Sequence, residues 1–255
     1  MRQPATGRGQ FTFRRRSDPA DADCERVRLS LSGLLGATQL LGCASYGSHL
    51  AATPVPQGTS ELSLNADGMI IDRGLGPQLL PNPEAALRYG LLRELDVGGR
   101  LNAGSLELDG RLRLVHTKAF ALSVVPGVGG GFVPVTNADT GLCNANLLAS
   151  VLGGFNLGGR DELTLGPRII STYAFPLTLF QGDATGARFV HSVGGVLGAR
   201  FAVGKRFALS PELNVFMPYD TERHEWYLPA VQGGLGFQFG SRPAVSRDAE
   251  RDHQE

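Results

Sequence analysis

The feature that most constrains this chain is a two-residue period of hydrophobicity that begins near residue 60. The stretch SLELDGRLRLV, residues 105–115, places leucines at 106, 108, 112 and 114 and charged residues at 107, 109, 111 and 113. A helix would spread these charges around its circumference, whereas a strand places all of them on one face. The pattern therefore predicts a strand with one apolar and one charged face.

The same period recurs to about residue 239 and predicts ten strands. They are 60–71, 84–92, 94–103, 105–116, 119–133, 145–158, 162–175, 187–203, 206–218 and 225–239. Strands of soluble proteins usually hold about 5 or 6 residues, whereas strands that cross a membrane in a barrel need about 9–11. Because most of the predicted strands hold nine or more residues, their length favours a membrane-spanning barrel.

The predicted connections alternate between tight and longer ones. Tight turns are predicted at Arg93, 117–118, 159–161 and 204–205. Longer loops are predicted at 72–83, 134–144, 176–186 and 219–224. A tight turn at Gly104, where a longer loop is expected, is the one exception to the alternation. Outer-membrane barrels have an even number of strands, short periplasmic turns and longer outer loops. We therefore predict an all-β fold, a single antiparallel up-and-down transmembrane β-barrel over residues 60–240. It has about ten strands, with eight or twelve as alternatives.

The two faces of these strands are predicted to differ in polarity. The inward face carries a network of charged residues, namely Arg88, Asp96, Arg100, Glu107, Asp109, Arg111, Arg113, Arg168, Arg200 and Glu212. The outward face carries apolar residues such as Leu87, Leu165, Ile169, Leu213 and Phe237. Opposite charges can pair across strands in a narrow lumen, and they would be costly to bury unpaired. We expect a lumen largely filled by side chains rather than a wide pore.

Aromatic residues fall near the predicted strand ends, at Tyr173, Phe175, Tyr219, Trp226 and Tyr227. Barrels in membranes carry aromatic girdles at both interfaces. The pattern fits such a girdle, and ordinary packing of aromatic residues in turns is the alternative.

Composition narrows the classes of function. The chain has 24 basic and 24 acidic residues, so nothing indicates a nucleic acid as partner. Its three cysteines, Cys24, Cys43 and Cys143, fit no metal or disulfide pattern. The glycine runs GVGGG and GGVLG lack the lysine that a phosphate-binding loop needs, and we expect no cofactor. After residue 43 no apolar run reaches the roughly 18 residues of a membrane helix, which excludes a helical membrane protein.

The N-terminal region resembles a targeting segment. Residues 29–42 carry no charge and are rich in Leu. Their end together with the next residue, Leu40-Leu41-Gly42-Cys43, resembles the lipobox of bacterial lipoproteins. The resemblance implies a signal peptide over 1–42, lipidation of Cys43 as the mature N-terminus, and handling by lipoprotein-sorting machinery. The long polar stretch before residue 29 suggests a true start near Val27. An ordinary cleaved signal and a short buried segment are the alternatives.

The two regions that flank the predicted barrel carry no strand period. Residues 43–59 are small and contain proline, which predicts a flexible, lipid-anchored tether with a solvated His49. Residues 241–255 are charged and are predicted to form a disordered polar tail.

The last predicted strand contains AVQGGLGFQFG, which resembles the aromatic-ended insertion signal of outer-membrane proteins, although residues 241–255 follow it. The resemblance implies the barrel-assembly machinery and outer-membrane lipid as partners. Together with the lipobox, it predicts a lipid anchor in the cell outer membrane. We expect a structural, binding or narrow-conduit role. A soluble periplasmic ligand-binding barrel of calycin type is one alternative, and it would have apolar residues inside.

Evidence for catalysis is confined to two small groups of residues. The last outer loop holds Asp220, Glu222 and His224, which match the rim of omptin proteases in composition but not in motif spacing. His191 and Ser192 resemble the histidine–serine pair of lipid A deacylases, but adjacent strand residues point to opposite faces. We therefore expect no enzymatic activity, with an outer-rim hydrolase as the second alternative.

Overall fold

The computed structural model describes residues 47–72, 77–102, 104–134, 140–178 and 187–240. The predicted signal peptide, Cys43 and the predicted tail fall outside these described residues. The strands are β1 (Ser60–Asp72), β2 (Pro77–Gly90), β3 (Leu95–Asn102), β4 (Ser105–His116), β5 (Phe120–Pro134), β6 (Thr140–Gly158), β7 (Asp161–Thr178), β8 (Arg188–Ala202), β9 (Phe207–Asp220), β10 (Glu225–Trp226) and β11 (Ala230–Gly240). Among the described residues there is no helix of the length and hydrophobicity needed to span a membrane.

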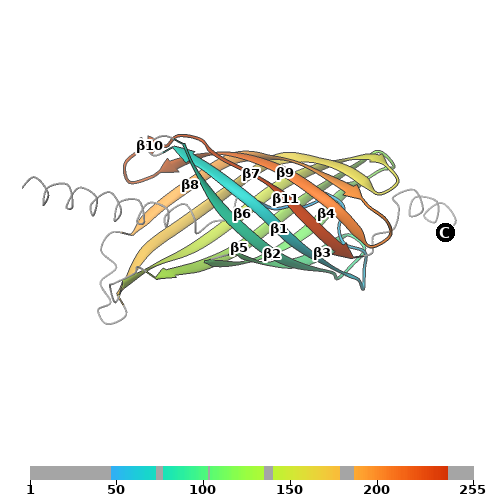
Figure 1. Ribbon diagram of the computed structural model, residues 1–255, viewed down its shortest axis with the longest axis horizontal. Coiled ribbons are helices and arrows are strands. Elements are labelled where there is room, and N and C mark those ends of the chain that lie inside the picture. Colours follow the sequence, from blue (N-terminus) through green and yellow to red (C-terminus); the bar gives the residue numbers. More distant parts are fainter. Residues whose placement is uncertain (1–46, 73–76, 103, 135–139, 179–186, 241–255) are drawn as a thin grey trace, which may run out of the picture. The chain divides into compact units, whose positions relative to one another are not determined.

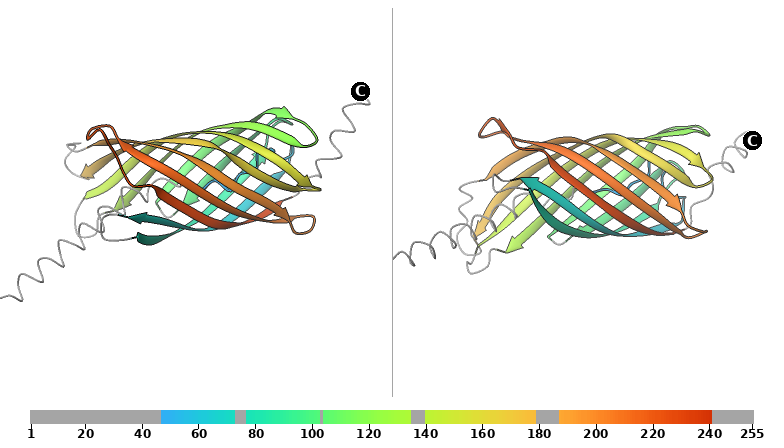
Figure 2. Two further views of the ribbon diagram at one scale, coloured as in Figure 1. Left: turned by 90° about the horizontal axis from the view of Figure 1, so that it is seen from above. Right: turned by 45° about the horizontal axis from the view of Figure 1, so that its top comes forward.

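The strands close into one antiparallel barrel, which confirms the predicted fold class. Each strand from β1 to β9 pairs with the next one along the chain, and β11 closes the ring by pairing with both β1 and β9. The two residues of β10 pair with Asp220 and Tyr219 at the end of β9 and do not form a separate strand of the wall. Ten strands thus form the wall of the described barrel, and Figures 1 and 2 show them inclined to its long axis.

The barrel has two ends that differ in their connections. We call the end where β1 begins and β11 ends the turn end, and the opposite end the loop end. At the turn end, two to four residues join β2 to β3, β4 to β5, β6 to β7 and β8 to β9. At the loop end, β7 and β8 are joined by residues 179–187 and β9 and β11 by residues 221–229, whereas β3 and β4 are joined only by residues 103–104.

The predicted long loop at 72–83 is wrong, because residues 77–83 belong to β2. Three prolines in this stretch favour a loop from sequence alone, since proline cannot donate to a strand ladder. In the structure Pro77, Pro81 and Pro83 all lie on the exposed face, and this part of β2 pairs with β1. The pairing of β2 with β3 begins only at Glu84, so the prolines lie beside an edge that has no ladder partner in β3.

Residues 47–59 are not the flexible, solvated tether that the sequence predicts. Within this stretch His49, Ala52 and Val55 are each at most 3% exposed, and the chain from residue 47 to residue 55 lies inside the barrel. It reaches the turn end at Gln57, which pairs with Gly90, and it then turns into β1. The prediction failed because small residues and prolines, which are typical of linkers, are also what a narrow lumen can accommodate.

Candidate functional site

The candidate site is the lumen together with the peptide that it holds. We call residues 47–56 the lumen segment. At its lower end the Val55 N–H donates to Asp96, the second residue of β3, at 2.7 Å. At its upper end the Gly47 carbonyl accepts from Arg100 and Arg168, the sixth residue of β3 and the eighth of β7. With the rise and tilt of barrel strands, Gly47 lies about 15 Å above the turn end.

Carboxylates of the wall accept the N–H groups of the lumen segment. Glu212 of β9 accepts from the Ser48 N–H at 2.6 Å and from the Ser48 hydroxyl at 2.9 Å. Glu162 of β7 accepts from the N–H groups of Ala52 and, at 3.4 Å, Thr53. A peptide inside a barrel has no ladder partner, so these carboxylates replace the hydrogen bonds that a strand would make.

Donors on other strands reach the carbonyl groups of the lumen segment. Gln238 of β11 donates to the His49 carbonyl at 2.8 Å. Arg111 of β4 donates to the Ala51 carbonyl, and the Ser123 hydroxyl of β5 donates to the Ala52 carbonyl at 2.5 Å. The segment is therefore bound along its backbone by side chains from several strands.

His49 fixes the upper half of the lumen segment. Its Nε2 lies 2.7 Å from Asp67 of β1, and its Nδ1 lies 2.8 Å from the Ser210 carbonyl of β9. Its φ of 44° is in the left-handed region, which costs energy for a residue with a side chain. Gly236 faces it, where a Cβ would lie 2.9 Å from His49 Nδ1. These contacts hold a kinked backbone in one place.

Apolar packing completes the contact between the segment and the wall. Leu50 and Ala52 form a buried cluster with Ala121, Val125, Leu152 and Val196, which point inward from β5, β6 and β8. A second buried cluster lies among residues farther along the strands toward the loop end and consists of Met69, Leu148, Ile170, Phe216 and Ala230. The lumen therefore contains apolar layers as well as charged ones.

Nine of the ten charged residues predicted to face inward lie buried in the lumen. They are Arg88, Asp96, Arg100, Glu107, Asp109, Arg111, Arg168, Arg200 and Glu212, each at most 7% exposed. Asp96 connects the wall to the lumen segment, because it accepts from Arg88 at 2.6 Å, from Arg111 and from the Val55 N–H. Such shared partners compensate for the cost of burying charge.

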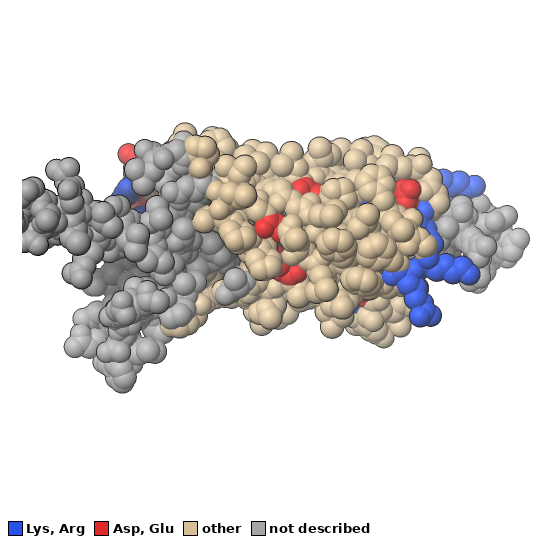
Figure 3. Space-filling view, in the orientation of Figure 1, with Lys and Arg blue, Asp and Glu red and all other residues tan. Residues whose placement is uncertain are grey.

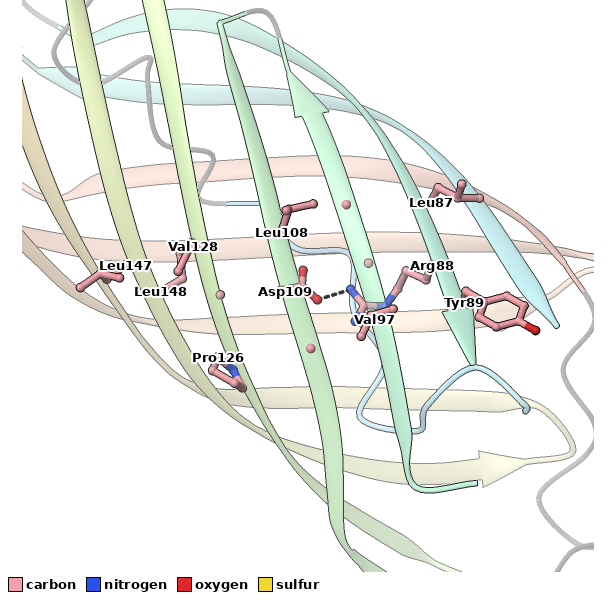
Figure 4. A pocket seen from close by; sticks show the side chains of 14 residues that line it. Leu87, Arg88, Tyr89, Val97, Leu108, Asp109, Pro126, Val128, Leu147 and Leu148 are labelled. Atoms are coloured by element: carbon pink, nitrogen blue, oxygen red, sulfur yellow. Dashed lines mark ion pairs between the residues drawn. The ribbon is translucent and has the colours of Figure 1, made fainter. Parts of the chain in front are cut away.

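The remaining pairs extend this network across the wall. Arg88 also pairs with Asp109 at 2.6 Å, and Arg100 pairs with Glu107 at 2.9 Å. Figure 4 shows the Arg88–Asp109 pair, with Leu87, Leu108 and other apolar residues around it. Those apolar residues line a groove of about 860 Å³ on the outer face of β2 to β6.

Two arginines have different surroundings from the rest. Arg200 donates to the Gln238 side chain at 2.9 Å and to the Arg160 carbonyl at 3.0 Å, near the turn end. Arg113 lies outside the central network and pairs with Glu94 of the β2–β3 turn at 2.5 Å. The Arg113 guanidinium holds the pKa of the Glu94 carboxyl below its usual range. A register shift in β4 between Arg113 and Val115 marks the point where the inward alternation ends.

The loop-end candidates Asp220, Glu222 and His224 do not form a common cluster. Asp220 accepts from the N–H groups of Glu222 and Arg223 at 2.9 and 3.1 Å, and from the Tyr227 hydroxyl at 2.7 Å. His224 lies exposed, with its Nδ1 3.3 Å from the Tyr219 hydroxyl. Asp220 thus caps the turn between β9 and β10, and burial together with the Asp220 contact raises the pKa of Tyr227.

His191 and Ser192 face opposite sides of the wall. Ser192 is 3% exposed and points inward, whereas His191 lies half-buried with its Nδ1 2.9 Å from the Ser171 hydroxyl of β7. The adjacent pair therefore does not act on one site. Among the described residues there is also no group of three or more His, Cys, Asp or Glu side chains placed to hold a metal ion.

Aromatic rings gather at both ends of the barrel. At the loop end Tyr173 lies 5.5 Å from Phe175 and Tyr219 lies 5.0 Å from Trp226, measured between ring centroids. At the turn end Phe207 lies 5.3 Å from Phe239. The second group was not among the predicted girdle residues, although it can be read from the same alternation.

Sequence reasoning missed the lumen segment and the wall residues that bind it most directly. These are Ser48, His49, Asp67, Ser123 and Glu162. The strand period already places Asp67 and Glu162 on inward faces. Nothing in residues 47–56 themselves predicts that they fill the barrel, because most of their hydrogen bonds to the wall are made by the backbone.

Comparison with known proteins gives structural likenesses only. No protein-family model and no curated protein matches the chain. Among solved structures, the chain is similar to Neisserial surface protein A (12% identity, 72% of this chain and 99% of that one, TM-score 0.31). It is also similar to the outer membrane protease OmpT of Escherichia coli (9% identity, 76% of this chain and 100% of that one, TM-score 0.37). A third similar structure is the attachment invasion locus protein Ail of Yersinia pestis (11% identity, 72% of this chain and 99% of that one, TM-score 0.40). At these values the likenesses transfer no activity, ligand or location.

The replacement of Asp96 with Asn tests its role as the connection between wall and segment. We expect Asp96→Asn to lower the free energy of unfolding by about 3 kcal/mol, because Arg88 and Arg111 lose the buried negative charge that they share, although Arg88 keeps its pair with Asp109. Urea unfolding of the detergent-folded protein measures this. The matched variant Glu94→Gln, whose carboxyl is half-exposed, should cost under about 1 kcal/mol. Equal effects for the two variants would contradict this role.

Proposed function

We propose that the chain is an outer-membrane β-barrel whose lumen is closed by its own lumen segment. In this proposal it has a structural, binding or narrow-conduit role and no enzymatic activity. The observation that carries the proposal is the inverted polarity of the barrel, with charges inside and apolar side chains outside. The soluble calycin-type alternative requires the opposite arrangement.

The exposed side chains of the wall support a membrane surrounding. Leu62, Leu87, Leu108, Leu147 and Leu197 are each between 41% and 63% exposed and come from different strands. A soluble protein rarely exposes contiguous apolar patches larger than a few hundred Å². Figure 3 shows Lys and Arg gathered at the turn end, while most of the visible side is uncharged. Such a belt fits the hydrocarbon region of a bilayer.

The spacing of the aromatic groups also fits a membrane. Phe207 at the turn end and Tyr219 at the loop end belong to the same strand, β9, and lie twelve positions apart. With the rise and tilt of barrel strands this is about 30 Å along the axis. The apolar band of outer-membrane barrels is about 25 Å tall and is flanked by aromatic girdles.

The contents of the lumen support a closed resting state. The lumen segment binds six of the ten wall strands through its backbone, and the cluster around Phe216 adds an apolar layer. The enzymatic alternative has less support, because the Asp220 carboxylate is already engaged by the turn that it caps.

Conductance across planar bilayers tests the closed state. We expect wild-type protein to give no stable openings, and a variant that lacks residues 47–56 to give discrete openings. Unboiled gels check that both proteins are folded. Identical records from the two folded proteins would contradict a plug role, and a mature protein that stays soluble without detergent would contradict the membrane proposal.

We also propose acylation of Cys43, on the resemblance of Leu40–Cys43 to a lipobox, with sorting and barrel-assembly machinery as partners. Three residues, 44–46, separate Cys43 from Gly47 and span about 14 Å at most. An acyl chain on Cys43 would therefore be held within about that distance of the lumen segment.

Labelling with a radioactive fatty acid tests this second proposal. We expect label in the wild-type protein and none in Cys43→Ala, with both proteins in the outer-membrane fraction. Absence of label from the wild-type protein would leave an ordinary cleaved signal in place of a lipid anchor.

A further inference from the structure

We propose that the lumen is a binding site for a short, kinked peptide, recognised through its backbone, and that residues 47–55 occupy this site in cis. The inference rests on the proposed function only in that the lumen segment fills the barrel. It goes further in assigning a class of ligand, a short peptide with mostly small side chains, which the same wall can bind from outside the chain.

The first support is the kind of group that is recognised. Four N–H groups of the segment, those of Ser48, Ala52, Thr53 and Val55, donate to wall carboxylates. Four carbonyl groups, those of Gly47, His49, Ala51 and Ala52, accept from wall side chains. Every peptide has these groups, so most of the hydrogen bonds between the wall and the segment do not depend on the sequence of the occupant.

The second support is the charge of the wall. Among the described residues nine acids and five arginines are buried, and without Asp220, which caps a turn at the loop end, eight of the acids remain. Carboxylates that lack a guanidinium partner are costly to bury without other donors. Glu162 and Glu212 take their donors from the lumen segment, in addition to Thr164 and Asn214 beside them. The wall therefore presents acceptors that a peptide backbone satisfies.

The third support is the space left for small side chains. A Cβ added at Gly154 of β6 would lie 2.8 Å from the Ala52 Cβ and 2.4 Å from Glu162 Oε1. The wall thus comes close to the Ala52 side chain at this point. The larger buried side chains of the segment are those of His49, Leu50, Pro54 and Val55.

The junction between the segment and the barrel allows a direct test. Gln57 and Gly58 are exposed, and Gly58 has a φ of 73° that suits a turn. A protease site inserted after Gly58 lies outside the lumen contacts. Cleavage of the folded protein in detergent then leaves the segment up to Gly58 bound without a covalent link. A fluorescent synthetic peptide of residues 45–57 is the probe.

We expect the labelled peptide to replace the cut segment and to co-migrate with the barrel on size exclusion. N-methylation of Ala52 removes the N–H that Glu162 accepts and should weaken binding at least tenfold. N-methylation of Ala51 adds the same bulk at an N–H for which the described residues show no acceptor, and it should have a smaller effect.

Three results would overturn the proposal. The first is a cut segment that stays bound and never exchanges, and the second is a segment that leaves without rebinding of the probe. The third is equal binding of the two methylated peptides. A failure of the membrane proposal would be seen separately, as protein that is soluble without detergent, because the exchange experiment needs only a folded barrel.

Discussion

The structure depends on how a peptide backbone inside a closed barrel finds its hydrogen bonds. The ten wall strands pair side by side in a closed ring, so the lumen segment has no neighbouring strand with which to form a ladder. The segment has to be satisfied by side chains, and Glu162, Glu212, Arg111 and Gln238 do this from four strands. Without them, burial of its polar groups would cost several kcal/mol.

The same alternation that closes the barrel also supplies these side chains. Because successive strand residues point to opposite faces, a strand with apolar residues outside can carry charges inside. In β4, Leu106 and Leu108 are more than half exposed, while Glu107 and Arg111 are almost fully buried. One sequence pattern therefore gives both the outward apolar belt and the inward network that holds the segment.

The sequence predicts the barrel well because its signal is local. Strand β4 has the predicted bounds of 105–116, and nine of the ten predicted lumen charges lie inside. The prediction fails where tertiary context overrides a local signal. Three prolines in β2 are tolerated beside an edge that β3 does not cover. Arg113 still pairs in register with the inward Ser123, but near the turn end its partner is Glu94 rather than the central network.

The lumen segment was beyond sequence reasoning for a different reason. Its small residues carry no period, and several of its contacts join positions more than 100 residues apart, such as Ser48 with Glu212. The acids that bind it are visible as inward residues, but their excess over arginines only becomes meaningful once the barrel is closed. The fold could be predicted from the sequence, whereas the occupant of its lumen could not.

The accessibility of a single thiol in native membranes tests most directly whether the segment is seated. In a background without the natural cysteines, Ser48→Cys places a thiol in the buried part of the lumen segment, and Gln57→Cys places one at the exposed position just beyond its end. A bulky, water-soluble maleimide added to permeabilised membranes should label the thiol at position 57, and it should label the thiol at position 48 only after the protein is unfolded. Equal labelling of the two positions in the folded protein would contradict a seated segment.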